Sequence, residues 1–192
     1  LRETRKIKIG VVNLTMFRPF PGDLLGSILR GRKGVCVLER TDQPLAVDLP
    51  LIREVRSGLA RCVENGRFAN GTIPFPDYPT YKKAEDMPPL YSGSFGLGSR
   101  DLQPEGLIGA IENMLPTGGK KKFFYLSIDF IHEKAFTPKQ ELHQIQVADA
   151  YPGLKDLAVH GSENPNLMPK NSITVRMHSV GGWGAITTGK NL

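Results

Sequence analysis

Apolar residues over positions 6–131 follow two spacings, one typical of strands and the other typical of helices. Short, nearly continuous apolar runs predict strands that are buried on both faces of a sheet. Between these runs, apolar residues three or four positions apart predict amphipathic helices. The strands are predicted at 6–17, 34–40, 91–97 and 121–130, and the helices at 21–31, 50–64 and 104–115.

The regular alternation of strand and helix predicts an α/β fold, a parallel sheet with flanking helices and right-handed crossovers. We assign residues 1–131 to this domain. Its core is expected to include Ile9, Val11, Val35, Val37, Leu126 and Ile128. The helix at 50–64 should bury Leu49, Ile52, Val55, Leu59, Cys62 and Val63, and the helix at 104–115 should bury Leu107, Ile108, Ile111 and Leu115.

The remainder of the chain is predicted to contain a connecting segment and a second α/β unit. Residues 132–171 are irregular by composition, with a short helix expected at 140–150. Residues 172–192 read as a strand, a glycine-rich turn and the first turn of a helix. Because this unit stops so early and the chain begins with Leu1, we expect the chain to be a fragment of a longer protein.

A long loop is predicted at 65–90, where five prolines interrupt the pattern. Loops of this length in a compact domain are usually functional or contact a partner. The aromatic residues Phe75, Tyr78 and Tyr81 are poorly suited to full exposure. We therefore expect this loop to cover an interface of the parent protein.

The net charge of +6 raises nucleic acid as a partner, but the arrangement of the charges does not favour it. The basic residues are scattered, and the one tight run, at 120–122, precedes a strand. The chain has no apolar run long enough to cross a membrane. Cys36 and Cys62 have neither zinc nor iron–sulfur spacing and fit a reducing cytoplasm. The four histidines lack metal-ligand spacing, so neither metal ligands nor catalytic residues are predicted.

Two loops that follow predicted strands are candidates for ligand binding. Arg40 and Thr41 come directly after one strand, and Gly98 and Arg100 follow the next. The carboxyl ends of parallel strands meet at one edge of the sheet, where ligands of α/β proteins bind. Arg40 and Thr41 are therefore predicted to bind a cofactor. An ordinary ion pair between Arg40 and Glu39 is an equal alternative, and for the glycine turn at 96–101 a plain connection from strand to helix is the favoured alternative.

The turn from Ser179 to Lys190 has the glycine spacing of a phosphate-binding loop. Glycines after a strand let the backbone approach a diphosphate, and the start of a helix supplies N–H donors. The predicted contacts are Ser179, Gly181, Gly182, Gly184, Thr187, Thr188 and Lys190. The loop differs at one position from the phosphate-binding loop of nucleoside triphosphatases, because Asn191 stands where a serine or threonine would bind magnesium. A tight turn that needs glycine for backbone reasons alone remains an alternative.

Several stretches in order along the chain resemble the 2-oxoacid:ferredoxin oxidoreductases, such as pyruvate:ferredoxin oxidoreductase. They are VVNLTMFRPFP, GVCVLERTDQPL, SGSFGLGSRDLQPEGLIGAIENM and FYLSIDF. The resemblance implies a domain like the C-terminal domain of transketolase, followed at 172–192 by the start of a gamma-type domain. The segment ERTDQPL departs from the family's usual DRTKEPG, and Trp183 stands where glutamine or aspartate is common.

The resemblance implies a part of an enzyme that oxidatively decarboxylates a 2-oxoacid and forms an acyl-CoA. Such enzymes use thiamine diphosphate with magnesium, iron–sulfur clusters and CoA, and they pass electrons to ferredoxin or flavodoxin. The thiamine motif and the cluster cysteines are absent from this sequence. We therefore expect the fragment to be inactive alone, to assemble with the remaining domains or subunits, and to contribute part of the CoA phosphate site. The alternative is a stand-alone α/β module that binds a nucleotide or a protein partner.

Overall fold

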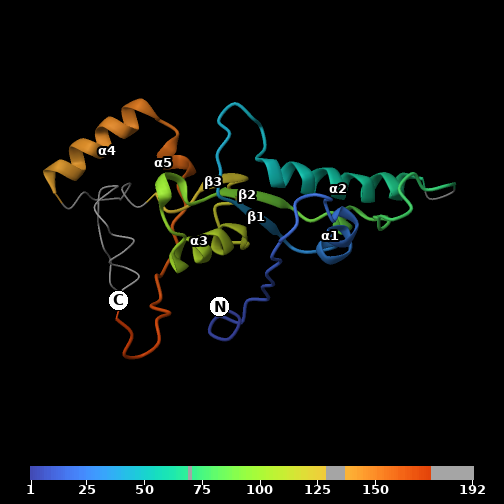
Figure 1. The fold of residues 1–192 in the computed structure, drawn as a ribbon, viewed down its shortest axis with the longest axis horizontal. Coiled ribbons are helices and arrows are strands. Elements are labelled where there is room, and N and C mark those ends of the chain that lie inside the picture. Colours follow the sequence, from blue (N-terminus) through green and yellow to red (C-terminus); the bar gives the residue numbers. More distant parts are fainter. Residues whose placement is uncertain (69–70, 129–136, 174–192) are drawn as a thin grey trace, which may run out of the picture.

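The computed structural model describes residues 1–68, 71–128 and 137–173 (Figure 1). Three parallel strands form its sheet, in the order β1-β2-β3. The strands are β1 (Val35–Glu39), β2 (Leu90–Ser94) and β3 (Phe123–Tyr125). The helices are α1 (Gly22–Leu29), α2 (Pro50–Arg67), α3 (Pro104–Met114), α4 (Pro138–Ala150) and α5 (Leu154–Leu157), with short 3-10 turns at Ala84–Asp86 and Leu97–Ser99. The predicted α/β class with a parallel sheet is confirmed.

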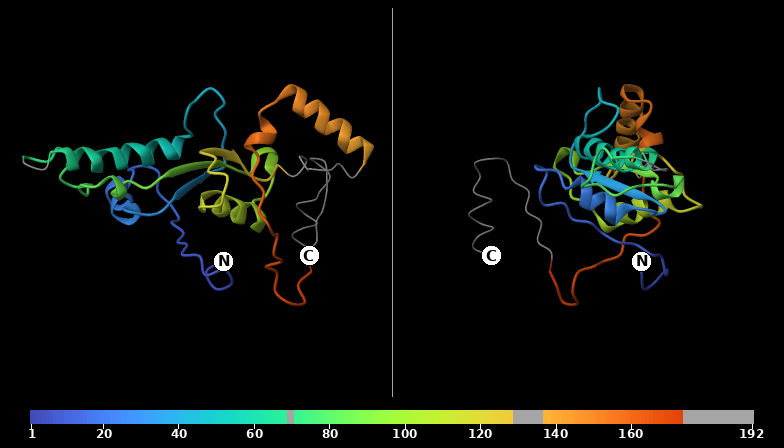
Figure 2. Two further views of the ribbon diagram at one scale, coloured as in Figure 1. Left: turned by 180° about the vertical axis from the view of Figure 1, so that it is seen from behind. Right: turned by 90° about the vertical axis from the view of Figure 1, so that its right-hand side faces the viewer.

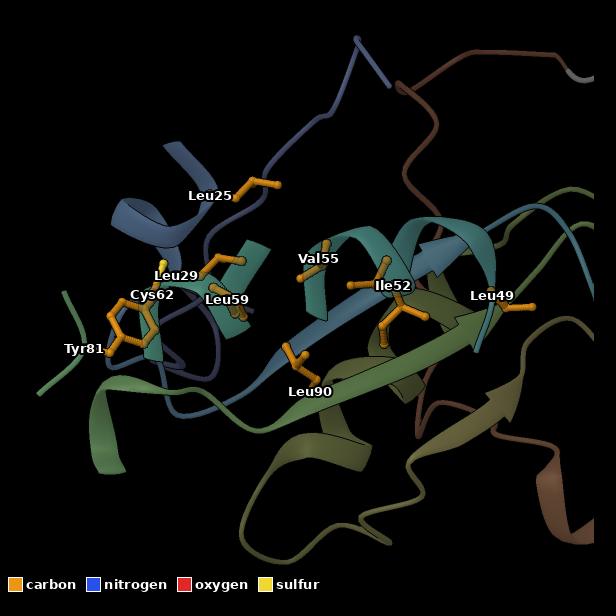
Figure 3. Packing of buried hydrophobic residues seen from close by; sticks show 10 residues of the cluster. Leu25, Leu29, Leu49, Ile52, Val55, Leu59, Cys62, Tyr81 and Leu90 are labelled. Carbon is orange, nitrogen blue, oxygen red and sulfur yellow. The ribbon is translucent and has the colours of Figure 1, made fainter. Parts of the chain in front are cut away.

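One face of the sheet is covered by α2, and α1 packs against α2; the two helices share a core with β1 and β2 (Figure 3). The apolar stripe predicted for α2 is the stripe that it buries, with Ile52 and Cys62 fully buried and Val63 partly so. This cluster consists of Leu25, Leu29, Val37, Leu49, Ile52, Val55, Leu59, Cys62, Tyr81 and Leu90. Burial of these apolar side chains is the main source of stability for this layer.

The opposite face of the sheet carries a smaller core formed with α3. Phe124 and Tyr91 are its large side chains, and Cys36 and Leu38 pack against them from β1. Alternate residues of β1 thus point to opposite faces, as the pleat of a strand requires. A Cβ on Gly93 would lie 2.6 Å from Leu38 and 2.7 Å from Phe124. Only glycine therefore fits at this position in the central strand.

The loop at 71–90 packs against its own domain. The side chain of Asn65 is fully buried and donates to the carbonyls of Phe75 and Tyr78 at 2.8 and 2.9 Å. The Tyr81 hydroxyl, also buried, donates to the carbonyl of Gly26 at 2.6 Å. Tyr81 is thus buried within the domain itself, and its aromatic ring gives no reason to expect a partner protein. The interface predicted for this loop loses this supporting observation and stays a prediction.

The first predicted strand, at 6–17, is wrong. The segment forms no strand ladder, and it runs beside the sheet (Figure 1). Val11 is 90% exposed and Ile9 is only half-buried, so neither belongs to the core. The segment is rich in β-branched residues, but such residues form a strand only where a neighbouring strand pairs with them. The other predicted core residues are confirmed at Val37, Leu126 and Ile128, while Val35 is partly buried.

The buried face of α3 matches the prediction at Ile108, which is 5% exposed, but differs from it elsewhere. Leu107 is 43% exposed, whereas Gly106, Gly109 and Ala110 are buried. A Cβ on Gly109 would lie 2.7 Å from the backbone of His160. The chain at 160–161 crosses α3 so closely that its small residues face inward.

The segment 137–173 begins with α4, which extends the predicted helix 140–150 by two residues at its start. None of its residues is buried, and the helix stands away from the sheet in each view (Figures 1 and 2). The short helix α5 leads back to β3, where Ala158 forms a parallel bridge with Tyr125. The predicted division into segments 132–171 and 172–192 stays a prediction, because residues 129–136 and 174–192 lie outside the described part.

Candidate functional site at the carboxyl edge of the sheet

Three parallel strands end side by side, and the residues that follow them form the candidate site, here called the carboxyl edge. It consists of residues 39–42 after β1, 94–101 after β2 and 125–128 after β3. Parallel strands of α/β proteins bind ligands at this end, because the loops there converge from several strands. A side chain at this edge can bind a ligand only if contacts within the protein leave its polar atoms accessible.

Glu39, the last residue of β1, is occupied by the protein itself. Its carboxylate is 8% exposed and accepts the backbone N–H groups of Leu51 and Ile52 at 2.6 and 3.1 Å. These are donors of the first turn of α2, which Leu49 does not cap with its side chain. A carboxylate is favoured at a helix N-terminus by the free N–H groups and the dipole. Glu39 therefore caps the N-terminus of α2, and its role is to stabilise the fold.

Arg40 is the first residue after β1, at the edge where the sequence placed it. Its Nε donates to the carbonyl of Gly96 at 3.4 Å, a weak bond, and the side chain is exposed. Gly96 has a φ of +70°, and a Cβ there would lie 2.9 Å from the Arg40 side chain. Glycine is thus required for both its conformation and this contact. Within the described ranges Arg40 forms no ion pair, so the alternative pair with Glu39 is not formed and the cation can meet a ligand.

Thr41 and Asp42 hold the loop that begins after Arg40. The carbonyl of Thr41 accepts the Ser94 hydroxyl at 2.6 Å, and the Asp42 carboxylate accepts the Tyr125 hydroxyl at 3.0 Å. Burial, together with this bond to Asp42, raises the pKa of Tyr125 to about 12. The tyrosine is therefore a neutral donor at physiological pH. These two bonds join the ends of all three strands.

The backbone of the carboxyl edge contains several left-handed residues. Gly98 has a φ of +65°, and Ser99 and Ser127, which are not glycines, have φ values of +60° and +63°. Arg100 donates to the carbonyl of Ser127 at 3.3 Å, which links the loops after β2 and β3. Non-glycine residues in this region are uncommon and gather at functional sites. Lys6, Lys120 and Asn171 share this conformation elsewhere in the described chain, so the feature is not confined to the carboxyl edge.

The described part of the chain shows no metal-binding cluster and no cysteine with a lowered pKa. No group of three or more His, Cys, Asp and Glu side chains there could hold a metal ion. Burial raises the pKa of Cys36 to about 12 and also raises the pKa of Cys62, so both remain thiols. No helix in the same ranges is long and apolar enough to cross a membrane.

Of the nine residues predicted to bind a cofactor, the structure describes Arg40 and Thr41. It places both at the carboxyl edge, with Arg40 against Gly96 and the Thr41 carbonyl against Ser94. Their binding to a ligand stays a prediction. The other seven, Ser179, Gly181, Gly182, Gly184, Thr187, Thr188 and Lys190, lie outside the described residues.

Sequence reasoning missed the roles of Glu39 and of the pair formed by Asp42 and Tyr125. Glu39 lies 12 residues before its hydrogen-bond donor Leu51, and Asp42 lies 83 residues before Tyr125. The sequence did contain one signal. Pro50 predicts the start of α2, and Leu49 before it has no side-chain acceptor for the first N–H groups of the helix, so another residue had to accept them.

The parallel sheet, its flanking helices and the carboxyl edge define an α/β domain. Comparisons with known proteins show which family this domain resembles. Residues 1–72 match the model of a family described as pyruvate:ferredoxin oxidoreductase core domain II. The predicted resemblance to the 2-oxoacid:ferredoxin oxidoreductases is therefore confirmed.

Individual relatives agree with this match. The chain is 33% identical over 108 residues to the pyruvate synthase subunit PorA of Thermotoga maritima, covering 56% of this chain and 22% of the relative. It is 28% identical over 121 residues to a probable pyruvate-flavodoxin oxidoreductase of Escherichia coli, covering 62% of this chain and 9% of the relative. The pyruvate:ferredoxin oxidoreductase of Moorella thermoacetica is 26% identical over 117 residues, or 60% and 8% of the two chains. The chain is thus similar to a minor part of much longer oxidoreductases.

Proposed function

We propose that this chain is a segment of a CoA-acylating 2-oxoacid:ferredoxin oxidoreductase. In that enzyme it supplies structure and part of the site for the phosphates of CoA. The observation that carries the proposal is the match of residues 1–72 to a core domain of pyruvate:ferredoxin oxidoreductase. The names of these relatives refer to pyruvate, which makes pyruvate the first 2-oxoacid to test.

The CoA site is proposed at the carboxyl edge together with the turn from Ser179 to Lys190. Arg40 supports this, because its exposed guanidinium has no acidic partner among the described residues. Guanidinium groups bind phosphate oxygens through two parallel hydrogen bonds. Lys190 and the backbone N–H groups around Gly184 would complete the phosphate contacts.

Other parts of the parent enzyme are proposed to hold the remaining cofactors. By the resemblance these are thiamine diphosphate with magnesium and iron–sulfur clusters, and the electron acceptor is ferredoxin or flavodoxin. Two of the three carboxylates at the carboxyl edge are already bonded within the protein, Glu39 to the start of α2 and Asp42 to Tyr125, which leaves few ligands there for the metal of thiamine diphosphate. The chain would work in the cytoplasm with its partner domains.

The test is made in the parent enzyme that contains this chain. We expect Arg40→Ala, and Gly184→Val combined with Lys190→Ala, each to raise the KM for CoA at least about tenfold, as when a charged hydrogen bond is lost. Decarboxylation of the 2-oxoacid without CoA should be unchanged. Lys33→Ala is the matched control, because Lys33 is an exposed cation that precedes the same strand at its opposite end.

Two results would contradict the proposal. Equal loss of both half-reactions would mean that these residues hold domains together rather than bind phosphate. Binding of ATP with magnesium but not CoA by the chain alone would favour the alternative, a stand-alone nucleotide-binding module.

A further inference from the structure

A cleft of about 300 Å³ lies between α2, the segment before α1, and the loop that carries Tyr78. It is separate from the carboxyl edge, since none of its lining residues follows a strand. Its polar lining consists of Arg18, Glu54, Ser57, Arg61 and Tyr78. Positions 54, 57, 58 and 61 recur at helical spacing, so one face of α2 forms the floor.

Arg61 is a cation that is held in place without an acidic partner. Its Nη1 donates to the Tyr78 hydroxyl at 2.8 Å. Its guanidinium also lies 5.4 and 5.2 Å from the ring centroids of Phe75 and Tyr78. These contacts fix the guanidinium before any ligand arrives, which lowers the entropy lost on binding. In the described part of the chain no ion pair neutralises it.

Arg18, on the other side of the cleft, is held in a similar way but is neutralised. Its guanidinium lies 4.2 Å from the Phe17 ring centroid and donates to the Phe17 carbonyl at 3.0 Å. Its Nη2 contacts the Glu54 carboxylate at 2.9 Å. The Arg18 side chain is 59% exposed and that of Glu54 is 32% exposed, so this pair is in water and weak.

Gly58 lies in the floor between the two arginines. A Cβ on Gly58 would lie 3.3 Å from Gly22, so the glycine allows α1 and α2 to approach closely. Gly58 also lines the cleft. The hydroxyl groups of Ser57 and Tyr78 border this space, and each can donate one hydrogen bond to an acceptor.

We propose that this cleft binds a small oxyanion, a phosphate or a carboxylate group, between Arg61 and Arg18. Arg61 supplies the permanent cation, and the hydroxyls of Ser57 and Tyr78 supply neutral donors. The Glu54 carboxylate forms an ion pair with Arg18, and a bound anion would have to compete with it for the same guanidinium. Removing this carboxylate should therefore tighten binding. The proposal is independent of the function proposed above.

The experiment follows thermal unfolding of the full 192-residue chain in increasing inorganic phosphate, with sodium chloride at equal ionic strength as the reference. A ligand that binds only the folded state raises the unfolding midpoint, and the dependence gives the half-saturating concentration. Glu54→Gln should lower that concentration about fivefold, because it removes one like charge near the anion. Arg61→Gln should raise it at least about tenfold, since a charged donor is lost.

Arg53→Ala is the matched control, since Arg53 is an exposed arginine of the same helix outside the cleft, and it should change the half-saturating concentration less than twofold. Acetate in place of phosphate distinguishes the two ligand sources. If the half-saturating concentrations of acetate rank the variants in the same order, the cleft binds carboxylates as well. If only phosphate raises the unfolding midpoint, the cleft is specific for phosphate groups. The proposal is overturned if phosphate stabilises all variants equally or not at all. The tightening by Glu54→Gln cannot result from a folding defect, so it stays decisive if Arg61→Gln unfolds.

Discussion

Helices α2 and α4 both carry a proline in the first turn, yet they differ completely in burial. Six residues of α2 are buried, whereas none of α4 is. In α2 the apolar residues recur every three or four positions from Ile52 to Cys62 and form one continuous stripe. In α4 the apolar pair Leu142 and Ile145 is followed by Asp149, so the stripe ends after one turn. Proline and good helix formers are enough to begin a helix, but a sustained stripe is needed to dock it.

The two helices are also capped differently. In α4 the Thr137 hydroxyl accepts the N–H of Gln140 at 3.3 Å, a cap encoded three residues away. In α2 the corresponding donors are satisfied by Glu39, which belongs to β1. The N-terminus of α2 thus depends on the sheet, while α4 is locally complete. Changes in α2 should therefore affect the whole domain, and changes in α4 should stay local.

The largest effect is expected for Leu59→Ala in α2. Leu59 is 1% exposed, and its removal leaves a cavity between α2 and the sheet. The free energy of unfolding should fall by about 2–5 kcal/mol, as for other buried leucines. Urea denaturation measures the change. A loss below about 1 kcal/mol would mean that α2 is not anchored to the sheet through this stripe.

A smaller but still large effect is expected for Asn65→Ala, near the end of α2. The change removes the bonds to the backbone of Phe75 and Tyr78 and leaves their polar groups without a partner. The free energy of unfolding should fall by about 1–3 kcal/mol. Cleavage by trypsin at Lys82 should become faster, because the loop is no longer held on α2. Asn166→Ala, an exposed asparagine with a local bond, is the control and should change neither measurement.

The ion pair between Arg30 and Asp86 gives a pH-dependent contribution at the end of α1. Two hydrogen bonds, at 2.9 and 3.0 Å, and the backbone N–H groups of Lys82 and Lys83 lower the pKa of Asp86 to about 2. Because the pKa is lower in the folded state, the stabilisation is fully present above about pH 3.9, the pKa of an unfolded aspartate. It is lost as the pH falls from there through about 2.

Asp86→Asn removes this dependence. The difference in unfolding free energy between the natural protein and Asp86→Asn should be constant above about pH 3.9 and should shrink below it. Thermal unfolding of both proteins over this range measures it. A difference that grows on acidification would contradict the lowered pKa. The effect is modest, since half of the Arg30 side chain is in water.

The smallest effect is expected for Ile145→Ala in α4. Ile145 is 54% exposed and borders no buried residue of its own helix. The free energy of unfolding should change by less than about 0.5 kcal/mol, as for other surface positions. The measurement is the same urea denaturation used for Leu59→Ala. A loss above about 1 kcal/mol would show that α4 docks on the domain in solution, and the contrast with α2 would fail.

The sequence predicted those features that depend on neighbouring residues. The alternation of strand and helix predicted the parallel α/β fold, and the period of α2 predicted its buried face, because both are written in the spacing of apolar residues. The position of Arg40 at the carboxyl edge followed in the same way from its place after β1. These features do not depend on which distant segment packs against them.

Other features were decided by the tertiary structure. The segment 6–17 has the composition of a strand but finds no partner strand in the described part of the chain. The inward face of α3 follows from the approach of residues 160–161, which are far away in sequence. The cleft between Arg18 and Arg61 likewise depends on the close packing of α1 on α2 at Gly58. Strand pairing and side-chain clusters need segments that are distant in sequence to meet, and local spacing does not encode which segments do so.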